Sequence, residues 1–422
     1  MPPSFPTMLE AALSAIDADA LARDVAALVQ VPSLTGDERL VMERFAALAA
    51  AQGLESEVVE HDLAALRAHP DHPGEEAERT ALFGALATLR GPAGARRICL
   101  NGHLDVVGAG EQPWQRDPFS GDIADGFVHG RGTADMKGGT VAALHAAGAV
   151  ARAARETGTE LPLEVVLQAV PSEEDGGLGT FAALEADDRF DAALIPEPTA
   201  FGLAAAQAGA LTFAGTIPGV PAHAAVRLEG ISAIDRYVLV HQALQQHERD
   251  INGRPSHPLL DALELPYPLL VGKVQAGAWS SQVPDLLTFE GRVGVRVDET
   301  VEEARAALER TVLEACPEAT IAWTGGQFAP GATDPDHPFL ARVADATEAE
   351  RGVRSPLVGV PYGADMRLFT ARGIPAVMLG PGGLELAHAV DERVVVDELV
   401  AIARIYVRAL LGEAEVAAGV GV

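Results

Sequence analysis

Apolar runs of strand length that end in histidine or acidic residues are the feature that most constrains the fold of this chain. In residues 100–107, His103 and Asp105 are two positions apart, so on a strand both side chains point to the same face. The short apolar run 191–195 is likewise followed by Glu197. Open α/β sheets place their binding and catalytic groups at the carboxyl ends of strands. The pattern therefore predicts an α/β sheet with a metal site at one edge.

Comparable positions elsewhere in the chain complete a larger set of candidate ligands. Asp135 directly precedes a helical run at 138–155, and an acidic pair follows the apolar run 163–170. The seven candidates are His103, Asp105, Asp135, Glu173, Glu174, Glu197 and His388. One such acid alone is more often a helix cap or a solvated side chain, but seven at matching positions are not independent coincidences.

The chemistry of this set indicates which metals it suits. Histidine and carboxylate ligands without thiolates suit zinc, cobalt or manganese better than they suit a structural site of the cysteine type. The set is also large enough for two ions that share one carboxylate. Such a pair can hold a water molecule between the ions and lower its pKa toward ~7. We therefore predict two divalent metal ions per chain.

The middle of the chain has a different pattern from its two ends. A length of 422 residues favours two domains. Residues 210–326 show strands and helices in the order βαββαβ, which is typical of the ferredoxin-like α+β sandwich. We predict that 1–209 and 327–422 form one α/β domain, a mixed sheet covered by helices, and that 210–326 are inserted into it. Near the start, the apolar spacing of residues 9–29 predicts a helical run.

Charge and cysteine content exclude several classes of function. Lys and Arg total 31 against 60 Asp and Glu, a net charge of −29, so nucleic acid and anionic membrane surfaces are not expected partners. No basic and apolar leader is present at the start, and no apolar stretch is long enough to span a bilayer. We expect a soluble cytoplasmic protein in which Cys99 and Cys316 are buried, inert thiols.

Five motifs together resemble a known enzyme family over nearly the whole chain. They are Gly102-His-Leu-Asp-Val-Val107, Gly130-Arg-Gly-Thr-Ala-Asp-Met-Lys-Gly-Gly139, Ser172-Glu-Glu174, Pro196-Glu197 and Ala387-His388. The chain resembles the co-catalytic zinc aminoacylase and carboxypeptidase family, which includes acetylornithine deacetylase, succinyl-diaminopimelate desuccinylase and glutamate carboxypeptidase. The inserted segment would then be a lid and dimerisation domain, and 1–209 with 327–422 the catalytic domain.

The resemblance implies a role for each candidate ligand. His103 and Glu197 would hold one ion, Glu174 and His388 the other, and Asp135 would bridge both. Zinc is the expected metal, with cobalt or manganese as alternatives. The resemblance also implies a cis peptide bond directly after the bridging aspartate.

Three further residues are implied to act in catalysis. Asp105 would orient His103 and fix its tautomer. Glu173 would be the general acid/base, taking a proton from the attacking water and giving it to the leaving amine. His223 resembles the family's lid histidine, which reaches the active site of a partner subunit and stabilises the oxyanion. A homodimer built through the inserted domain follows from that assignment.

More than one arginine is a candidate for binding the substrate. Arg296 matches the lid arginine that grips a substrate carboxylate, but Gly294 replaces the acid that usually stands two residues earlier, so Arg292 is a competing candidate. Arg367 is a third cation expected near the pocket. The chain also departs from the family at Trp279-Ser-Ser-Gln-Val-Pro-Asp285, where the usual Asn before Val-Pro-Asp is missing.

The leading hypothesis is a metal-dependent amide hydrolase that removes an acetyl, succinyl or formyl group from the nitrogen of a small amino acid or amine. The alternative enzyme is a metallo-exopeptidase of the glutamate carboxypeptidase or dipeptidase type with the same site. A catalytically silent binding protein is the alternative from another class. That hypothesis predicts the loss of a ligand or of the base, whereas all seven candidates are present.

Overall fold

The computed structural model describes residues 5–419, and within them a nine-stranded mixed sheet forms the centre of the larger body. Along the sheet the order is β1 (Glu55–His61), β2 (Leu82–Leu89), β6 (Leu163–Val170), β3 (Arg96–His103), β7 (Ala192–Ile195), β15 (Ala376–Met378), β8 (Leu203–Gln207) and β13 (Gly331–Ala332), with β14 (Leu357–Val360) paired to β8. β3 runs parallel to both β6 and β7, whereas β1 and β2 are antiparallel. The predicted α/β fold class is confirmed.

Helices cover both faces of this sheet because its strands are apolar on both sides. Ile98 and Leu100 of β3 pack into one buried cluster, and Cys99 between them packs into another. The first face carries α1 (Phe5–Ser14), α2 (Ala18–Val29), α3 (Arg39–Ala51), α5 (Gly138–Thr157), α9 (Pro338–Arg351) and α11 (Val396–Ala417). The second face carries α4 (Leu63–Arg67), α6 (Leu178–Ala186) and α10 (Met366–Thr370).

The helical run expected over residues 9–29 is divided into α1 and α2. The division has a local cause, because the side chain of Asp17 accepts a hydrogen bond from the amide of Ala20 at 2.7 Å and so caps the start of α2. Asp17 thus starts a second helix inside a continuous apolar pattern.

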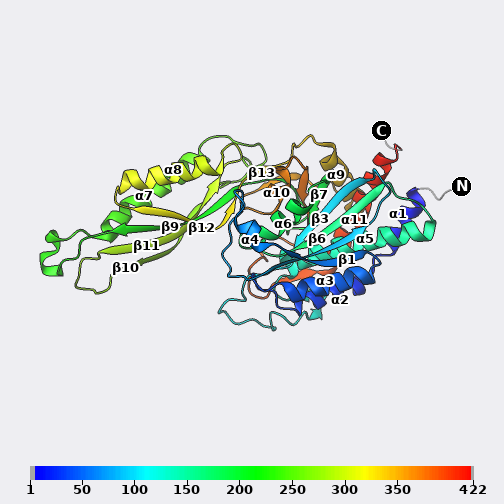
Figure 1. Ribbon diagram of the computed structural model, residues 1–422, viewed down its shortest axis with the longest axis horizontal. Coiled ribbons are helices and arrows are strands. Elements are labelled where there is room, and N and C mark those ends of the chain that lie inside the picture. Colours follow the sequence, from blue (N-terminus) through cyan, green and yellow to red (C-terminus); the bar gives the residue numbers. More distant parts are fainter. Residues whose placement is uncertain (1–4, 420–422) are drawn as a thin grey trace.

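A separate four-stranded antiparallel sheet projects from the body at the end opposite α1 (Figure 1). Its strands are β9 (Gly209–Pro218), β10 (Leu269–Ala276), β11 (Leu286–Val295) and β12 (Thr320–Phe328). The order β10-β11-β9-β12, with α7 (Ala233–Asn252) and α8 (Val301–Ala315) packed against one face, is that of a ferredoxin-like unit. We call this unit the lid. The domain boundaries at 210 and 326 stay a prediction, close to the ends of β9 and β12.

Three smaller elements complete the structure around the site. A three-stranded sheet has the order β16 (Arg393–Val395), β5 (Phe127–His129) and β4 (Ile123–Ala124). The short turn η1 (Thr133–Lys137) leads into α5, and the 3-10 helix η2 (Ala224–Glu229) lies in the lid. In residues 5–419 no helix is both long and apolar enough to cross a membrane. Cys99 and Cys316 are buried free thiols, as predicted.

Candidate metal centre

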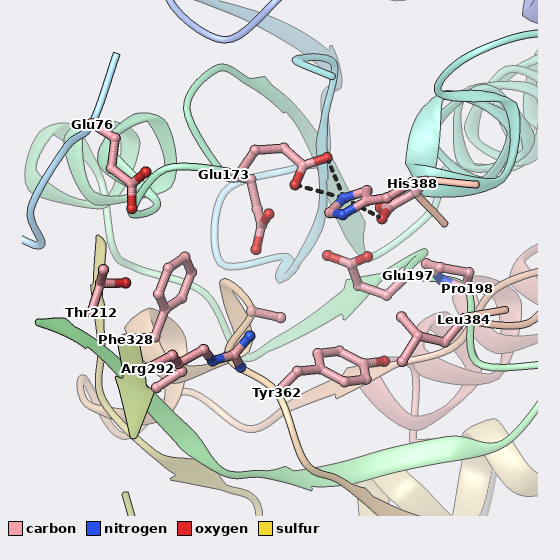
Figure 2. A pocket seen from close by; sticks show the side chains of 15 residues that line it. Glu76, Glu173, Glu197, Pro198, Thr212, Arg292, Phe328, Tyr362, Leu384 and His388 are labelled. Carbon is pink, nitrogen blue, oxygen red and sulfur yellow. Dashed lines mark hydrogen bonds and ion pairs between the residues drawn. The ribbon is translucent and has the colours of Figure 1, made fainter. Parts of the chain in front are cut away.

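Three neighbouring parallel strands bring the candidate ligands to one edge of the central sheet. β6, β3 and β7 lie side by side, so the residues at their carboxyl ends meet. His103 is the last residue of β3, Glu174 lies in the turn after β6, and Glu197 follows β7. Asp135 comes from η1, and His388 comes from the loop between β15 and β16. Figure 2 shows Glu197 and His388 facing the same cavity.

These five residues form two groups of potential ligands that share Asp135. Ligand atoms of His103, Asp135 and Glu197 lie within 4.8 Å of one another, and so do those of Asp135, Glu174 and His388. The Nε2 atom of His103 is 3.1 Å from Asp135 Oδ1. The Nε2 atom of His388 is 3.0 Å from Glu174 Oε2 and 3.6 Å from Asp135 Oδ2.

The donor set fits a pair of divalent cations. All five residues offer nitrogen or oxygen atoms, and three of them are carboxylates gathered at one point. Burial, together with the neighbouring Asp135, raises the pKa of Glu197 well above its usual range. Crowding of this kind is unfavourable for ionised acids, and bound cations would offset it.

The carboxylate of Asp105 lies near His103, as expected, and it also contacts the turn after β6. The oxygens accept hydrogen bonds from the amides of Glu173 at 3.1 Å and Glu174 at 3.2 Å, and from the hydroxyl of Thr35 at 3.0 Å. His103 Nδ1 is 2.9 Å from the main-chain oxygen of Asp105 and 3.5 Å from its carboxylate. The Asp105 backbone is thus the closest partner of the imidazole, while the side chain holds the turn that carries the two glutamates.

Glu173 is buried and lines a cavity of about 370 Å³ beside the ligands (Figure 2). Among residues 5–419, its carboxylate has no hydrogen-bond or ion-pair partner, so both oxygens are available to a substrate. Burial and the nearby Glu197 raise the pKa of Glu173 well above its usual range. A carboxyl group with these properties suits general acid/base chemistry.

The three candidate arginines have different environments. Arg292 in β11 lines the cavity, where Figure 2 shows it across from Glu173. Its guanidinium makes no hydrogen bond or salt bridge with any residue in the described part of the chain. Arg296 does not line the cavity. Its buried guanidinium donates hydrogen bonds to the main-chain oxygens of Ile251, Arg254 and Pro255 and to the carboxylate of Asp298. The expectation that Arg296 grips substrate is therefore corrected, because its donors are already used inside the lid.

Arg367 is also committed to the protein rather than to the cavity. Its buried guanidinium donates hydrogen bonds to the main-chain oxygens of Ala364 and Gly176, at 2.9 and 2.7 Å, and lies 4.2 Å from the ring centroid of Phe328. Phe328 itself lines the cavity. Arg367 thus supports the wall of the cavity from behind, which corrects its expected role in substrate binding.

His223 lies in the lid, apart from the ligands of its own chain. It is exposed, caps η2 by accepting a hydrogen bond from the amide of Ala225, and shares a surface hollow with Trp279. It does not line the cavity beside Glu173. The fold of a single copy therefore does not place His223 at the metal centre.

Two residues near the ligands were not singled out from the sequence. Glu392 is buried and accepts hydrogen bonds from the amides of Gly132, Ala134 and Asp135 and from Arg131 Nη1 at 2.6 Å. It thereby fixes the turn that presents Asp135, where the expected cis peptide bond is found between Asp135 and Met136. Tyr362 also lines the cavity. A single acid or tyrosine in a loop has no pattern that marks it in advance.

Comparison with known proteins shows the family of this chain. The sequence model of the family described as peptidase family M20/M25/M40 matches residues 99–412. The chain belongs to this family. It is accordingly a hydrolase, and the match begins within β3, just before His103, and extends past His388 into α11.

Curated relatives of this M20-family chain include two N-acyl hydrolases. It is 30% identical over 334 residues to a succinyl-diaminopimelate desuccinylase of Methylorubrum extorquens, covering 74% of this chain and 82% of the relative. It is 27% identical over 339 residues to an N-formyl-4-amino-5-aminomethyl-2-methylpyrimidine deformylase of Bacillus subtilis, covering 73% and 77%. Among solved structures, a dipeptidase from Saccharomyces cerevisiae matches 98% of this chain and 99% of its own with a TM-score of 0.75 at 16% identity. That structure supports the fold.

Proposed function

We propose that this chain is an amide hydrolase that uses two divalent metal ions to remove an acyl group from the nitrogen of a small amino acid or amine. The observation that carries the proposal is the pair of ligand groups sharing Asp135 beside the buried Glu173, whose carboxylate has no partner in the described part of the chain. The M20 family supplies the hydrolase class, and the desuccinylase and deformylase names of two relatives support an N-acyl substrate.

The proposed ligands are His103 and Glu197 for one ion, Glu174 and His388 for the other, and Asp135 for both. Bound cations would polarise the amide carbonyl and lower the pKa of the attacking water. Zinc suits this donor set, and cobalt or manganese would also fit it.

Glu173 is the proposed general acid/base. It takes the proton of the water that attacks the amide carbon, and it gives a proton to the nitrogen when the carbon–nitrogen bond breaks. The carboxylate of Asp105 accepts hydrogen bonds from the amides of Glu173 and Glu174, which fixes the position of the base relative to the neighbouring ligand.

Arg292 is the proposed group that binds a substrate carboxylate. It is the arginine that lines the cavity, and its guanidinium has no hydrogen-bond or ion-pair partner among the described residues. Thr212 and Phe328 lie beside it and Tyr362 lies further along the same wall, giving the remainder of the pocket a mixed polar and apolar surface (Figure 2). A volume of about 370 Å³ is suited to a small substrate.

The proposed active unit is a homodimer formed through the lid, in which His223 of one copy donates to the oxyanion in the other. Large apolar side chains lie exposed on the lid, including Leu228 at 93% and Trp279 at 71%, as expected of a surface that a partner covers. A mixture of the variants His223→Ala and Glu173→Gln tests this. Because a mixed dimer contains one complete site, mixing two nearly inactive proteins should restore up to about a quarter of the native activity. No gain on mixing, despite exchange of subunits, would contradict the shared site.

A substrate panel tests the reaction itself. Protein loaded with zinc, cobalt or manganese is assayed with N-acetyl, N-succinyl and N-formyl amino acids beside dipeptides. Hydrolysis of the acyl amino acids is expected, and the variant Glu173→Gln should keep two ions per chain while losing about 10²–10⁴ in kcat. Turnover of dipeptides alone would favour the exopeptidase instead. Near-native activity of the Glu173 variant would show that another group is the base.

A further inference from the structure

A buried arginine outside the ligand set holds the turn that carries Glu173. The side chain of Arg79 is fully buried, with Nη1 donating to the hydroxyl of Ser172 at 2.7 Å and Nη2 to Asp175 Oδ2 at 2.9 Å. Ser172 in turn donates to the other oxygen of Asp175. Arg79 therefore forms hydrogen bonds to the residues on either side of the Glu173–Glu174 pair. The planar guanidinium, with several donors in fixed positions, suits such a two-point contact.

The turn has a backbone that requires support. Ser172 has a φ of +65°, in the left-handed region that is unfavourable for a residue with a side chain. Gly176, at the other end of the turn, lies so close to the loop before Arg79 that an added Cβ would be 2.4 Å from the main-chain oxygen of Gly74. A conformation of this kind persists only where its surroundings fix it.

The loop before Arg79 supplies further contacts to the same turn and also reaches the lid. Asp175 Oδ2 accepts hydrogen bonds from the amides of Glu76 and Ala77, at 3.0 and 2.8 Å. The main-chain oxygen of Pro73 accepts a hydrogen bond from the amide of Gln327 in β12 at 2.9 Å. The side chain of Glu76 lines the cavity (Figure 2). The segment 73–79 thus joins the turn of Glu173 to a strand of the lid.

We infer that Arg79 is a positioning residue for Glu173: by bonding Ser172 and Asp175 together it fixes the backbone that aims the Glu173 carboxylate into the cavity. This inference rests on the proposed function, because it takes Glu173 as the acid/base. Arg79 touches neither the ligands nor the cavity, so it acts only through the turn. A displacement of about 1 Å in a catalytic group can cost as much as 10²-fold in rate.

A double-mutant cycle separates this role from a general contribution to folding. Arg79→Gln should lower kcat by about ten- to a hundredfold, with KM within about threefold and two ions per chain retained. The Glu173→Gln background has no carboxyl group at this position for Arg79 to orient. Adding Arg79→Gln there should lower the residual kcat by less than about twofold. Equal losses in both backgrounds would overturn the inference, because loss of folded or metal-loaded protein reduces both rates alike.

Two further variants keep the test decisive. Arg90→Gln removes an exposed arginine that follows β2 and pairs with Glu55, and it should leave kcat unchanged. Asp175→Asn keeps the side-chain shape and replaces Arg79→Gln in the test if that variant does not fold. Like Arg79→Gln, it should lower kcat in the native background and have little effect in the Glu173→Gln background. A loss for Glu173→Gln without any loss for the Arg79 and Asp175 variants would refute the positioning role and leave the proposed function intact. Near-native activity of Glu173→Gln would instead refute the acid/base assignment on which the inference rests.

Discussion

Substitution of Arg292 and of Arg296 by methionine should have opposite consequences, although the two residues are four positions apart. Arg292 faces the cavity, and its guanidinium has no hydrogen-bond or ion-pair partner among residues 5–419, whereas the guanidinium of Arg296 is buried and donates to three main-chain oxygens of the lid. Methionine keeps most of the side-chain bulk but has no donors. Arg292→Met should therefore impair substrate binding and leave stability normal. Arg296→Met should lower stability and leave substrate binding normal.

The contacts give the size of both effects. A hydrogen bond to a charged group contributes about 1.5–3 kcal/mol, so losing one between Arg292 and a substrate carboxylate should lower kcat/KM by about 10- to 100-fold. For Arg296, the oxygens of Ile251, Arg254 and Pro255 would lose their donors. At a net contribution of about 1 kcal/mol for each of these three hydrogen bonds, the free energy of unfolding should fall by about 3 kcal/mol.

The assay uses paired substrates and a denaturant titration. Each variant is tested with an N-acyl amino acid and with the same compound in which the carboxylate is converted to an amide, and urea unfolding is followed in parallel. Arg292→Met should affect only the carboxylate substrate. If Arg292→Met reduces turnover of both compounds equally, or if Arg296→Met raises KM at unchanged stability, the assignment from the structure is incorrect.

Three other substitutions test the surroundings of the site. Glu392→Gln, which weakens the support of the Asp135 turn, should lower metal affinity by about 10- to 100-fold in a chelator competition. His388→Ala should leave about one ion per chain by elemental analysis, since its partner ligands Asp135 and Glu174 remain. Burial and nearby Asp105 raise the pKa of Glu38 from 4.5 to about 7, so its protonation stabilises the fold at low pH and this contribution is lost as the pH rises through 7. Glu38→Gln should therefore remove a decline of about 3 kcal/mol between pH 4.5 and 8, measured by urea unfolding of metal-free protein.

The central sheet and the meeting of the candidate ligands follow from local patterns. Strands of the length and apolarity of β3, β6 and β7 favour a buried parallel arrangement, and neighbouring parallel strands present their carboxyl ends at one edge. His103, Glu174 and Glu197 therefore come together for a reason that can be stated from their positions in the chain. The break between α1 and α2 was missed because a capping aspartate interrupts the helix without interrupting the apolar spacing.

The sequence by itself determined the α/β class and the inserted βαββαβ unit, because both depend on periodicity. It also indicated that His103, Glu174 and Glu197 would gather, because each follows or ends a strand, whereas Asp135 and His388 were indicated by motifs. Tertiary structure alone decided that Arg292 rather than Arg296 faces the cavity, since the guanidinium of Arg296, just after β11, is already bonded to the main chain near the end of α7. It also revealed Arg79 and Glu392, whose partners lie 93 and 257–261 positions away along the chain. Contacts between such distant residues leave no local pattern, because they form only when the elements have packed.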